Sequence, residues 1–236
     1  MEARGICKVV RPPGLTDYAE ALAWQRTLAK ARASGDLAHD LLILLQHPHV
    51  ITLGRGAHES NLTASPEMLQ RRDVAVHEIE RGGDVTYHGP GQLVGYPILD
   101  LNRHKKDLHW YLRRLEQVLI DALAAFGVEG TRIPELTGVW IQDRKIASIG
   151  VHVTRWVTFH GFALNVSTDL SYFELIIPCG IDAVKMTSIK DETSSDPDFD
   201  QVLEQVSASF GEAFGLEMEW EGVESLLALS LTGHSP

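Results

Sequence analysis

Cysteine is scarce in this sequence, and stretches of apolar residues are short. Its 236 residues include only Cys7 and Cys179, too few for the disulfide framework of a small secreted protein. The amino-terminal residues MEARGICKVV lack the apolar stretch of a secretion signal. The longest apolar run, residues 41–45 (LLILL), is far shorter than the roughly 20 residues that cross a bilayer, and it predicts a buried strand. We therefore expect a cytoplasmic protein without a membrane segment.

Basic residues are also fewer than acidic residues. The chain has 21 Lys and Arg against 32 Asp and Glu, which gives a formal net charge of -11 at pH 7. Nucleic-acid binding depends on clustered Lys and Arg that neutralise phosphates, so we expect no nucleic-acid partner. Three short basic runs, at 103–106, 71–72 and 113–114, are typical of solvated faces and indicate no particular role.

Several motifs that mark cofactor, metal and hydrolase sites are missing. The glycines fit neither GxxxxGK[ST] nor GxGxxG, so nucleotide binding is not supported. Eleven histidines, among them His47 and His49 on either side of a proline, make a metal site conceivable. Neither HExxH nor paired CxxC motifs are present to support zinc, and the GxSxG motif of serine hydrolases is absent. We expect no metal and no cofactor.

Length and composition indicate one globular domain over residues 1–236. Hydrophobic residues make up 44% and charged residues 22%, which are ordinary values for a protein with a packed core. Domains run to roughly 250 residues, so two independent domains would each be cramped. Repeats, low-complexity blocks and linkers rich in Pro, Gly or Ser are also lacking.

Three stretches have the apolar periodicity of amphipathic helices. We expect the first helix to run from Asp17, its N-terminal cap, to Gly35, and the second from Asp107, also a cap, to about Gly127. We expect the third to run from Asp196 to about Gly215. The third is expected to begin with Asp196 as its cap and Pro197 as its first helical residue. Residues 191–198 (DETSSDPD) are polar enough to form a surface loop.

Runs rich in β-branched and aromatic residues predict strands between these helices. Their limits are 74–79, 93–101, 139–142, 145–153 and 157–166. Asp143 and Arg144 separate two of the runs, and this short spacing predicts a hairpin that leads into Lys145. Helices and strands must bury their apolar faces against each other, so we expect an α+β fold in which helices pack on a mixed β-sheet.

One segment of the sequence is unusually dense in glycine. Residues 81–97 (RGGDVTYHGPGQLVGYP) contain five glycines and two prolines within a strand-like region. Glycines allow positive φ angles and a close approach of the backbone, so this segment could bring main-chain N–H groups against a ligand. A tight turn followed by a β-bulge explains the same composition, and the sequence leaves both interpretations open.

The two cysteines lie in different contexts. Cys179 lies between Pro178, which fixes its own φ, and Gly180, which has no side chain. This predicts a positioned thiol that is accessible from one side, although a cysteine in an apolar run is commonly an inert core residue. Cys7 lies between Ile6 and Lys8 at the start of an apolar stretch and is interpreted as inert.

Four motifs together closely resemble the lipoyl(octanoyl) transferase family, in the same order and at similar spacing. They are RGGDVTYHGPGQLVGYP, GVWIQDRKIASIGVHV, HGFALNVSTDL and IIPCGI, which fall between Arg81 and Ile181. HPHVITLGR at 47–55 and the first expected helix also resemble this family. The resemblance implies the fold of the biotin/lipoate protein ligase catalytic domain. It adds little beyond Phe214.

The resemblance implies transfer of an octanoyl or lipoyl group from acyl carrier protein to a specific lysine of lipoyl domains. Those acceptors would be E2 subunits of 2-oxoacid dehydrogenases and the H protein of glycine cleavage. By the same resemblance, Cys179 is the acylated nucleophile and Lys145 its charged partner. Acyl-binding contacts would come from Arg81, Gly82, Gly83, Asp84, Val85, Thr86, Tyr87, His88, Ser148, Ile149, Gly150, Gly161, Phe162 and Ala163.

Elementary chemistry agrees with a cysteine and lysine pair. A thiolate is the competent nucleophile, and a free cysteine with a pKa of about 8.5 is mostly protonated at neutral pH. A neighbouring ammonium group favours the thiolate. We hypothesise that acylation of Cys179 removes its negative charge, after which Lys145 gives up its proton more readily and accepts one from the incoming amine.

An apolar tunnel would give specificity for a medium-length acyl chain. Burial of about seven carbons at about 0.8 kcal/mol each contributes roughly 5 to 6 kcal/mol before ordering costs. Small residues such as Gly82, Gly83 and Ala163 are candidates for its walls. Two other functions remain open: an ATP-dependent lipoate or biotin ligase of the same fold, which would not need Cys179, and a noncatalytic acyl-binding protein.

Overall fold

The computed structural model describes residues 4–177, 184–224 and 226. Five α-helices and two 3-10 helices are described: α1 Tyr18–Ser34, η1 Glu59–Asn61, α2 Pro66–Arg71, α3 Leu108–Ala124, η2 Leu170–Leu175, α4 Ile189–Thr193 and α5 Phe199–Phe214. The described strands are β1 Gly5–Val10, β2 Asp40–Leu45, β3 Val50–Leu53, β4 Ala75–Glu78, β5 Val85–His88, β6 Gln92–Ile98, β7 Thr131–Ile133, β8 Leu136–Ile141, β9 Arg144–Thr154, β10 Val157–Asn165, β11 Lys185–Met186 and β12 Leu216–Glu221. None of the helices in these ranges is long and apolar enough to cross a membrane.

Most strands form one mixed sheet of nine strands within the described residues. Their order is β12-β1-β2-β6-β10-β9-β8-β7, and β11 adds to β9. The pairs β1 with β12, β1 with β2 and β11 with β9 are parallel. From β2 through β6, β10 and β9 to β8 and β7 the pairing is antiparallel. The mixed sheet with packed helices confirms the α+β fold class expected from the sequence.

Three further strands form a small sheet in the order β4-β3-β5. It packs with α2 and η2 around a separate apolar cluster that includes Ile51, Leu69 and Phe173. Gly82, in the loop before β5, donates its N–H to the carbonyl of Val151 in β9 at 2.9 Å. The glycine-rich segment therefore joins the small sheet to the main sheet.

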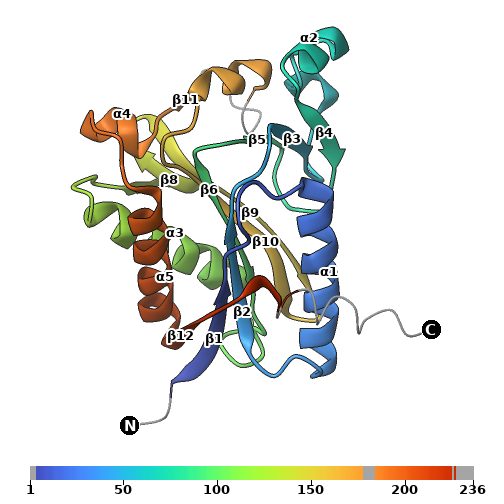
Figure 1. Cartoon of the computed structure of the whole chain (residues 1–236), viewed down its shortest axis with the longest axis vertical. Helices are drawn as coiled ribbons and strands as arrows, with labels where there is room; N and C mark the ends of the chain where they lie inside the picture. Colours follow the sequence, from blue (N-terminus) through green and yellow to red (C-terminus); the bar gives the residue numbers. More distant parts are fainter. Residues whose placement is uncertain (1–3, 178–183, 225, 227–236) are drawn as a thin grey trace.

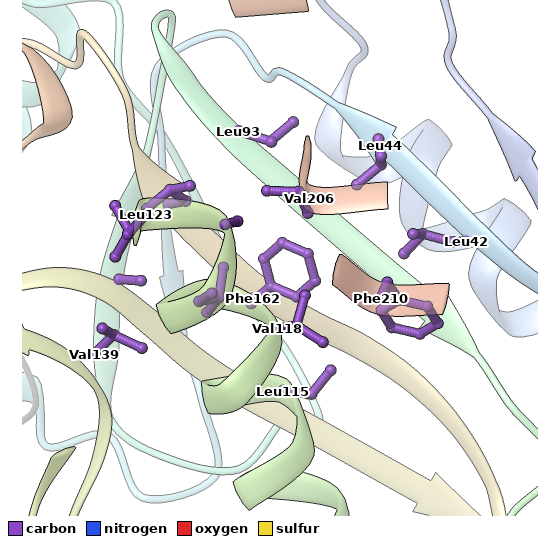
Figure 2. Close-up of a cluster of buried hydrophobic side chains, with 14 of the residues drawn as sticks. Leu42, Leu44, Leu93, Leu115, Val118, Leu123, Val139, Phe162, Val206 and Phe210 are labelled. Carbon is purple, nitrogen blue, oxygen red and sulfur yellow. The ribbon is translucent and has the colours of Figure 1, made fainter. Parts of the chain in front are cut away.

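Helices cover both faces of the main sheet, as Figure 1 shows with α1 on one side and α3 and α5 on the other. The apolar residues of α1 pack on β6 and β10 in one cluster. A larger cluster lies between the opposite face and α3 with α5. In Figure 2, Leu42, Leu44, Leu93 and Phe162 of the sheet meet side chains of α3 and α5 such as Val118 and Phe210.

The first two expected helices are confirmed, with the caps that the sequence indicates. The Asp17 carboxylate accepts hydrogen bonds from the N–H groups of Ala19 and Glu20, and α1 ends at Gly35 with φ 89°. The Asp107 carboxylate accepts from the N–H of Trp110 at the start of α3. Each cap satisfies donors that a helix leaves unpaired at its first turn.

The predicted start of the third helix is wrong. α5 begins at Phe199, because the Asp198 carboxylate accepts from the N–H groups of Asp200 and Gln201 and so takes the capping role assigned to Asp196. The predicted end at Gly215 is correct, with φ 68°. The expected surface loop at 191–198 is partly wrong as well, since Ser188 caps the short helix α4.

The expected strands are all present, but others were not predicted from the sequence. The hairpin between β8 and β9 exists, although its loop is one residue earlier than predicted because Ile141 pairs with Arg144. Gln142 in this loop has φ 56°. The unpredicted strands β1 and β12 pair with each other from opposite ends of the described chain. Such long-range pairing leaves no signal in a local pattern.

We predict that Gly95→Ala destabilises the protein because Gly95 of β6 lies directly opposite Phe162 of β10. A Cβ atom at Gly95 would overlap the Phe162 ring. The free energy of unfolding should fall by about 1 to 3 kcal/mol, the range for an overpacked core, as measured by urea denaturation. Gly5→Ala is the control, since its Cβ would meet only Leu216 Cδ2 at 3.1 Å. Equal losses in both variants would contradict this prediction.

Candidate functional site

A cavity of about 360 Å³ opens between the glycine-rich segment, β9, β10 and the start of α3. This volume is within the range of small-ligand pockets. Thirteen of the fourteen expected acyl-binding residues line it: 81–86 with His88, Ser148–Gly150, and Gly161–Ala163. Lys145 also lines it. The structure thus brings three motifs that are far apart in the sequence to one cavity wall.

Strand register explains how these motifs meet. β9 and β10 pair antiparallel, with Ser148 opposite Ala163, Ile149 opposite Phe162 and Gly150 opposite Gly161. A Cβ atom at Gly150 would lie 3.0 Å from the carbonyl oxygen of Gly82, so this glycine allows the loop before β5 to lie close against β9. β5 itself lies within the glycine-rich segment at 81–97, directly after this loop.

Lys145 lies at one end of the cavity and is only 3% exposed. Its Nζ lies 5.2 Å from the centre of the Trp140 ring, a cation–π arrangement. Its carbonyl accepts a hydrogen bond from the N–H of Thr187 at 3.0 Å. A lysine in this position brings one positive charge to an otherwise largely apolar wall.

Cys179, the expected nucleophile, lies outside the described residues. The described chain before it ends at Ile177, whose N–H donates to the carbonyl of Asn61 at 2.7 Å. After it, Lys185 and Met186 pair in parallel with Arg144 and Lys145. Lys185 and Met186, in the described chain on the far side of Cys179, are therefore paired alongside the strand that carries Lys145.

Cys7 is fully buried in β1 within the larger apolar cluster. Burial raises the pKa of its thiol far above the ordinary value, and the nearby Asp40 carboxylate adds to the effect. A thiol that stays protonated is a poor nucleophile. This environment agrees with the inert role expected for Cys7.

Arg81 brings a second cation to the cavity wall. Its guanidinium group donates to the carbonyl oxygen of Thr52 at 2.7 Å, to Thr52 Oγ1 and to the carbonyl of Gly82. The side chain is nearly buried. These bonds fix the guanidinium plane against the glycine-rich loop, so Arg81 contributes both to the shape of the cavity and to its charge.

Tyr87 is the one expected binding residue that does not line the cavity. Alternate residues of a strand point to opposite faces, so Thr86 and His88 of β5 face the cavity while Tyr87 faces the cluster of the small sheet. The Tyr87 hydroxyl lies 2.7 Å from Nδ1 of His49, and its ring stacks on Tyr172. The structure therefore places Tyr87 in the core of the small sheet.

The end of the cavity opposite Lys145 is lined by residues that sequence reasoning missed. Tyr18, Tyr96 and His160 form this end, and His160 pairs with Val151, six positions along β9 from Lys145. At about 3.3 Å per residue, Lys145 and Val151 are roughly 20 Å apart along β9. Leu108 and Leu112 at the start of α3 also line the cavity, and Leu108 is 43% exposed.

His160 has an unusual backbone and environment. Its φ is 55°, and its N–H donates to Oε1 of Gln25 at 2.8 Å. The side chain is 1% exposed, and within the described part of the chain neither ring nitrogen has a hydrogen-bond partner. Strained backbone of this kind occurs at ligand sites more often than elsewhere. The sequence motif HGF gave no separate signal for it.

Burial keeps three histidines near this end of the cavity neutral. Desolvation lowers the pKa of His47 to about 4 and the pKa values of His88 and His160 to about 3. His47 donates from Nδ1 to the Thr16 carbonyl at 2.7 Å, so its Nε2 accepts from the Tyr96 hydroxyl at 2.7 Å. The positive charge of Arg81 further lowers the pKa values of His88 and His160, so neutral histidines lie beside a fixed cation at this end of the cavity.

Comparison with known proteins places the chain in a family. Residues 17–211 match the family described as the lipoyl protein ligase A/B catalytic domain. The chain belongs to this family. The octanoyltransferase of Solibacter usitatus is 54% identical over 211 residues, which cover 89% of this chain and 94% of the relative. The octanoyltransferase of a Nostoc species is 49% identical over 87% of this chain and 91% of the relative. The resemblance to the lipoyl(octanoyl) transferase family is confirmed.

Solved structures of low sequence identity share the fold. A lipoate-protein ligase A bound with ATP superposes with a TM-score of 0.79 at 15% identity, over 98% of this chain and 94% of the other. A bipartite lipoate protein ligase from Thermoplasma acidophilum gives 0.77 at 16% identity, over 97% and 91%. A biotin protein ligase from Aquifex aeolicus gives 0.52 at 14% identity, over 89% and 68%. The expected likeness to lipoate and biotin ligase catalytic domains is confirmed at the level of fold.

We predict that His47→Gln reduces the acid sensitivity of the protein. The pKa of His47 is lower in the folded state than the ordinary 6.5, so the unfolded state binds more protons between pH 6.5 and about 4. Stability therefore falls as the pH falls through this window, by at most about 1.4 kcal/mol per pH unit for each such histidine. Urea denaturation between pH 7 and pH 4.5 should give a shallower slope for the variant. His39→Gln, at an exposed histidine, should keep the original slope, and an unchanged slope for His47→Gln would refute the prediction.

Proposed function

We propose that this chain transfers an octanoyl group from acyl carrier protein to a specific lysine of lipoyl domains, through a thioester on Cys179. The observation that carries the proposal is close to half identity with octanoyltransferases over nearly the whole chain. On the same ground the chain is an acyltransferase. The cavity beside Lys145 supports the proposal further, because it offers a long apolar space next to a buried cation.

The first half-reaction moves the acyl group onto the enzyme. The Cys179 thiolate attacks the carbonyl carbon of the carrier's thioester, a new C–S bond forms, and the bond to the carrier sulfur breaks. The carrier leaves as a thiol after it takes up a proton. One thioester replaces another, so little driving force is needed. The role of Lys145 is to favour the thiolate with its positive charge.

The second half-reaction makes the amide. With a pKa of about 10.4, only roughly one free lysine in 2500 is neutral at pH 7, so the acceptor amine must lose a proton. After acylation, Cys179 no longer carries a negative charge beside Lys145, so the Lys145 ammonium releases its proton to solvent and the resulting neutral amine accepts the proton of the attacking amine. The C–N bond forms, the C–S bond breaks, and the proton returns to the cysteine sulfur.

The cavity suits an acyl chain of medium length. Ile149, Phe162, Ala163 and Val94 give it apolar walls, and burial of about seven carbons contributes roughly 5 to 6 kcal/mol before ordering costs. The acyl carbonyl lies at the Lys145 end in this proposal, so the chain extends along β9 towards His160.

The partners follow from the same proposal. Acyl carrier protein is the donor, and lipoyl domains of 2-oxoacid dehydrogenase E2 subunits and the glycine cleavage H protein are the acceptors. We place the reaction in the cytoplasm, in one domain formed by residues 1–236. A thiol nucleophile needs the reducing conditions of that compartment.

An ATP-dependent ligase of the same fold is the alternative. The structural neighbours described as ligases are 15% to 16% identical, while the octanoyltransferases are 49% to 54% identical. A ligase would activate a free acid and would be indifferent to Cys179. Product formation from free octanoate that depends on ATP and survives Cys179→Ala would favour the ligase.

We predict that mixing the enzyme with octanoyl-carrier produces one octanoyl adduct, which maps to Cys179 and disappears when a lipoyl domain is added. Intact mass spectrometry followed by peptide mapping measures this directly. Cys179→Ala should give no adduct. Cys7→Ala should give the full adduct, because that thiol is buried in the core. Absence of any adduct on the wild-type enzyme under single-turnover conditions would contradict the proposed thioester.

We predict that Lys145→Arg separates the two half-reactions. Arginine keeps a positive charge beside the thiolate, but it does not give up a proton near neutral pH. Acylation should therefore persist while transfer to the lipoyl domain slows by about a hundredfold or more, the range for a lost general base. Rapid-quench mass spectrometry measures both rates. Lys30→Arg, at an exposed lysine of α1, is the control. Equal slowing of both steps would argue against Lys145 as the base.

A further inference from the structure

Glu116 is a fully buried carboxylate that the proposed mechanism does not use. It lies on α3, on the side that faces β8, and its side chain is inaccessible to solvent. Burying a carboxylate is unfavourable unless the charge is paired and hydrogen-bonded. The hydrogen-bond partners of Glu116 therefore indicate its role.

Both carboxylate oxygens of Glu116 are used. Oε2 accepts from Arg113 Nη1 at 2.7 Å and from Arg132 Nε at 3.0 Å. Oε1 accepts from the backbone N–H of Gly138 in β8 at 3.3 Å. Arg132 also donates to the Arg113 carbonyl and to Gln117, so the cluster joins α3 to the strands β7 and β8.

Gly138, the backbone partner of Glu116, lies directly against the side chain of Lys145. A Cβ atom at Gly138 would lie 2.7 Å from Lys145 Cε, 3.3 Å from its Nζ and 2.6 Å from the Ala147 carbonyl oxygen. The φ of Gly138 is 131°, which side chains rarely adopt. The pairing of β8 with β9 shifts register at the next residues, Val139 and Trp140. The lysine methylenes therefore occupy the space that the missing side chain leaves.

Trp140 lies on the same strand two residues later, and its ring faces Lys145 Nζ. Two surfaces that hold the Lys145 side chain, the backbone of Gly138 and the ring of Trp140, thus belong to β8 at its irregular point. A displacement of β8 would move both of them together. Glu116 is attached to this part of β8 by its bond to the Gly138 N–H.

We propose that Glu116, held by Arg113 and Arg132, is a positioning residue that aims the Lys145 amine by fixing Gly138. The inference rests on the proposed function, in which Lys145 takes part in both half-reactions. Glu116 does not touch the reacting atoms, and its effect passes through the backbone of β8.

Glu116→Gln is the sharpest test, because a carboxylate accepts hydrogen bonds on both oxygens while an amide accepts on one and donates from the other. In the variant, the amide NH2 of the glutamine is a donor. It must therefore face either the Gly138 N–H or the two guanidinium groups, which are donors themselves. Its shape is otherwise unchanged. Glu129→Gln makes the same chemical change at an exposed glutamate beyond the end of α3 and is the matched control.

The first measurement is amide hydrogen exchange at Gly138, which needs no activity. Glu116→Gln should speed exchange at Gly138 at least tenfold relative to the wild type and to Glu129→Gln. Unchanged exchange at Gly138 would overturn the proposal. If the wild-type enzyme transferred no octanoyl group, the proposed function would fail, and this measurement would still decide whether Glu116 holds Gly138.

The second measurement is single-turnover transfer from the acylated enzyme to a lipoyl domain. A displaced amine should lower the rate constant about tenfold to a hundredfold, with the KM for the acceptor and the reaction amplitude unchanged. A merely structural role would lower the amplitude, because part of the enzyme would be unfolded, and would leave the rate constant as it was. A wild-type rate constant in Glu116→Gln would overturn the proposal.

Gly138→Ala provides a second variant should Glu116→Gln fail to fold. It keeps the Glu116 side chain but adds a methyl group against Lys145 Cε and strains the backbone at Gly138, so it should lower the same rate constant. Gly130→Ala is its control, because a Cβ there would crowd only apolar side chains, Val139 Cγ1 at 2.9 Å and Leu123 Cδ1 at 3.1 Å. Equal rate constants in the two alanine variants would contradict the proposal.

Discussion

The antiparallel pairing of β9 with β10 is the constraint on which the cavity depends. Eight residue pairs, from Val157 with Thr154 to Leu164 with Ala147, hold the two strands in register. Because a shift of one residue would turn every side chain to the other face, this register alone decides that Ser148 to Gly150 and Gly161 to Ala163 line one wall. In this register His160 pairs with Val151, six residues along β9 from Lys145. The apolar clusters on both faces of the sheet then stabilise that register.

Few charged side chains line this largely apolar cavity. Arg81 and Lys145 bring cations to its walls, and each is held by contacts that also shape the cavity: Thr52 for Arg81, and Trp140 with Gly138 for Lys145. A buried cation with fixed surroundings can favour an anionic nucleophile more strongly than one in water, because the local dielectric constant is lower. At the opposite end, burial keeps His47, His88 and His160 neutral. The cavity thus has Lys145 at one end and, towards the other, the Arg81 guanidinium beside neutral histidines.

The sequence predicted the parts of this arrangement that depend on local pattern. The caps Asp17 and Asp107, the strand runs and the glycine-dense segment each leave a signal within a few residues, and the family resemblance grouped the cavity residues before any contact was known. The predicted cap of the third helix was wrong, because Asp196 and Asp198 are neighbouring aspartates and the local pattern does not distinguish them. The predicted binding role of Tyr87 is not supported by its position, because the alternation of β5 turns this residue of the motif away from the cavity. Tyr18, Tyr96 and Glu116 acquire their places only through tertiary packing, which no local pattern encodes.

In the proposed reaction the acyl chain lies along β9 with its carbonyl beside Lys145. A crystal structure of the enzyme with a bound octanoyl chain would show this placement. We expect electron density for the chain between Ile149 and Ala163, with the carbonyl at the Lys145 end and the methyl group towards His160. Density for the chain outside this cavity, or in the reverse direction, would contradict it.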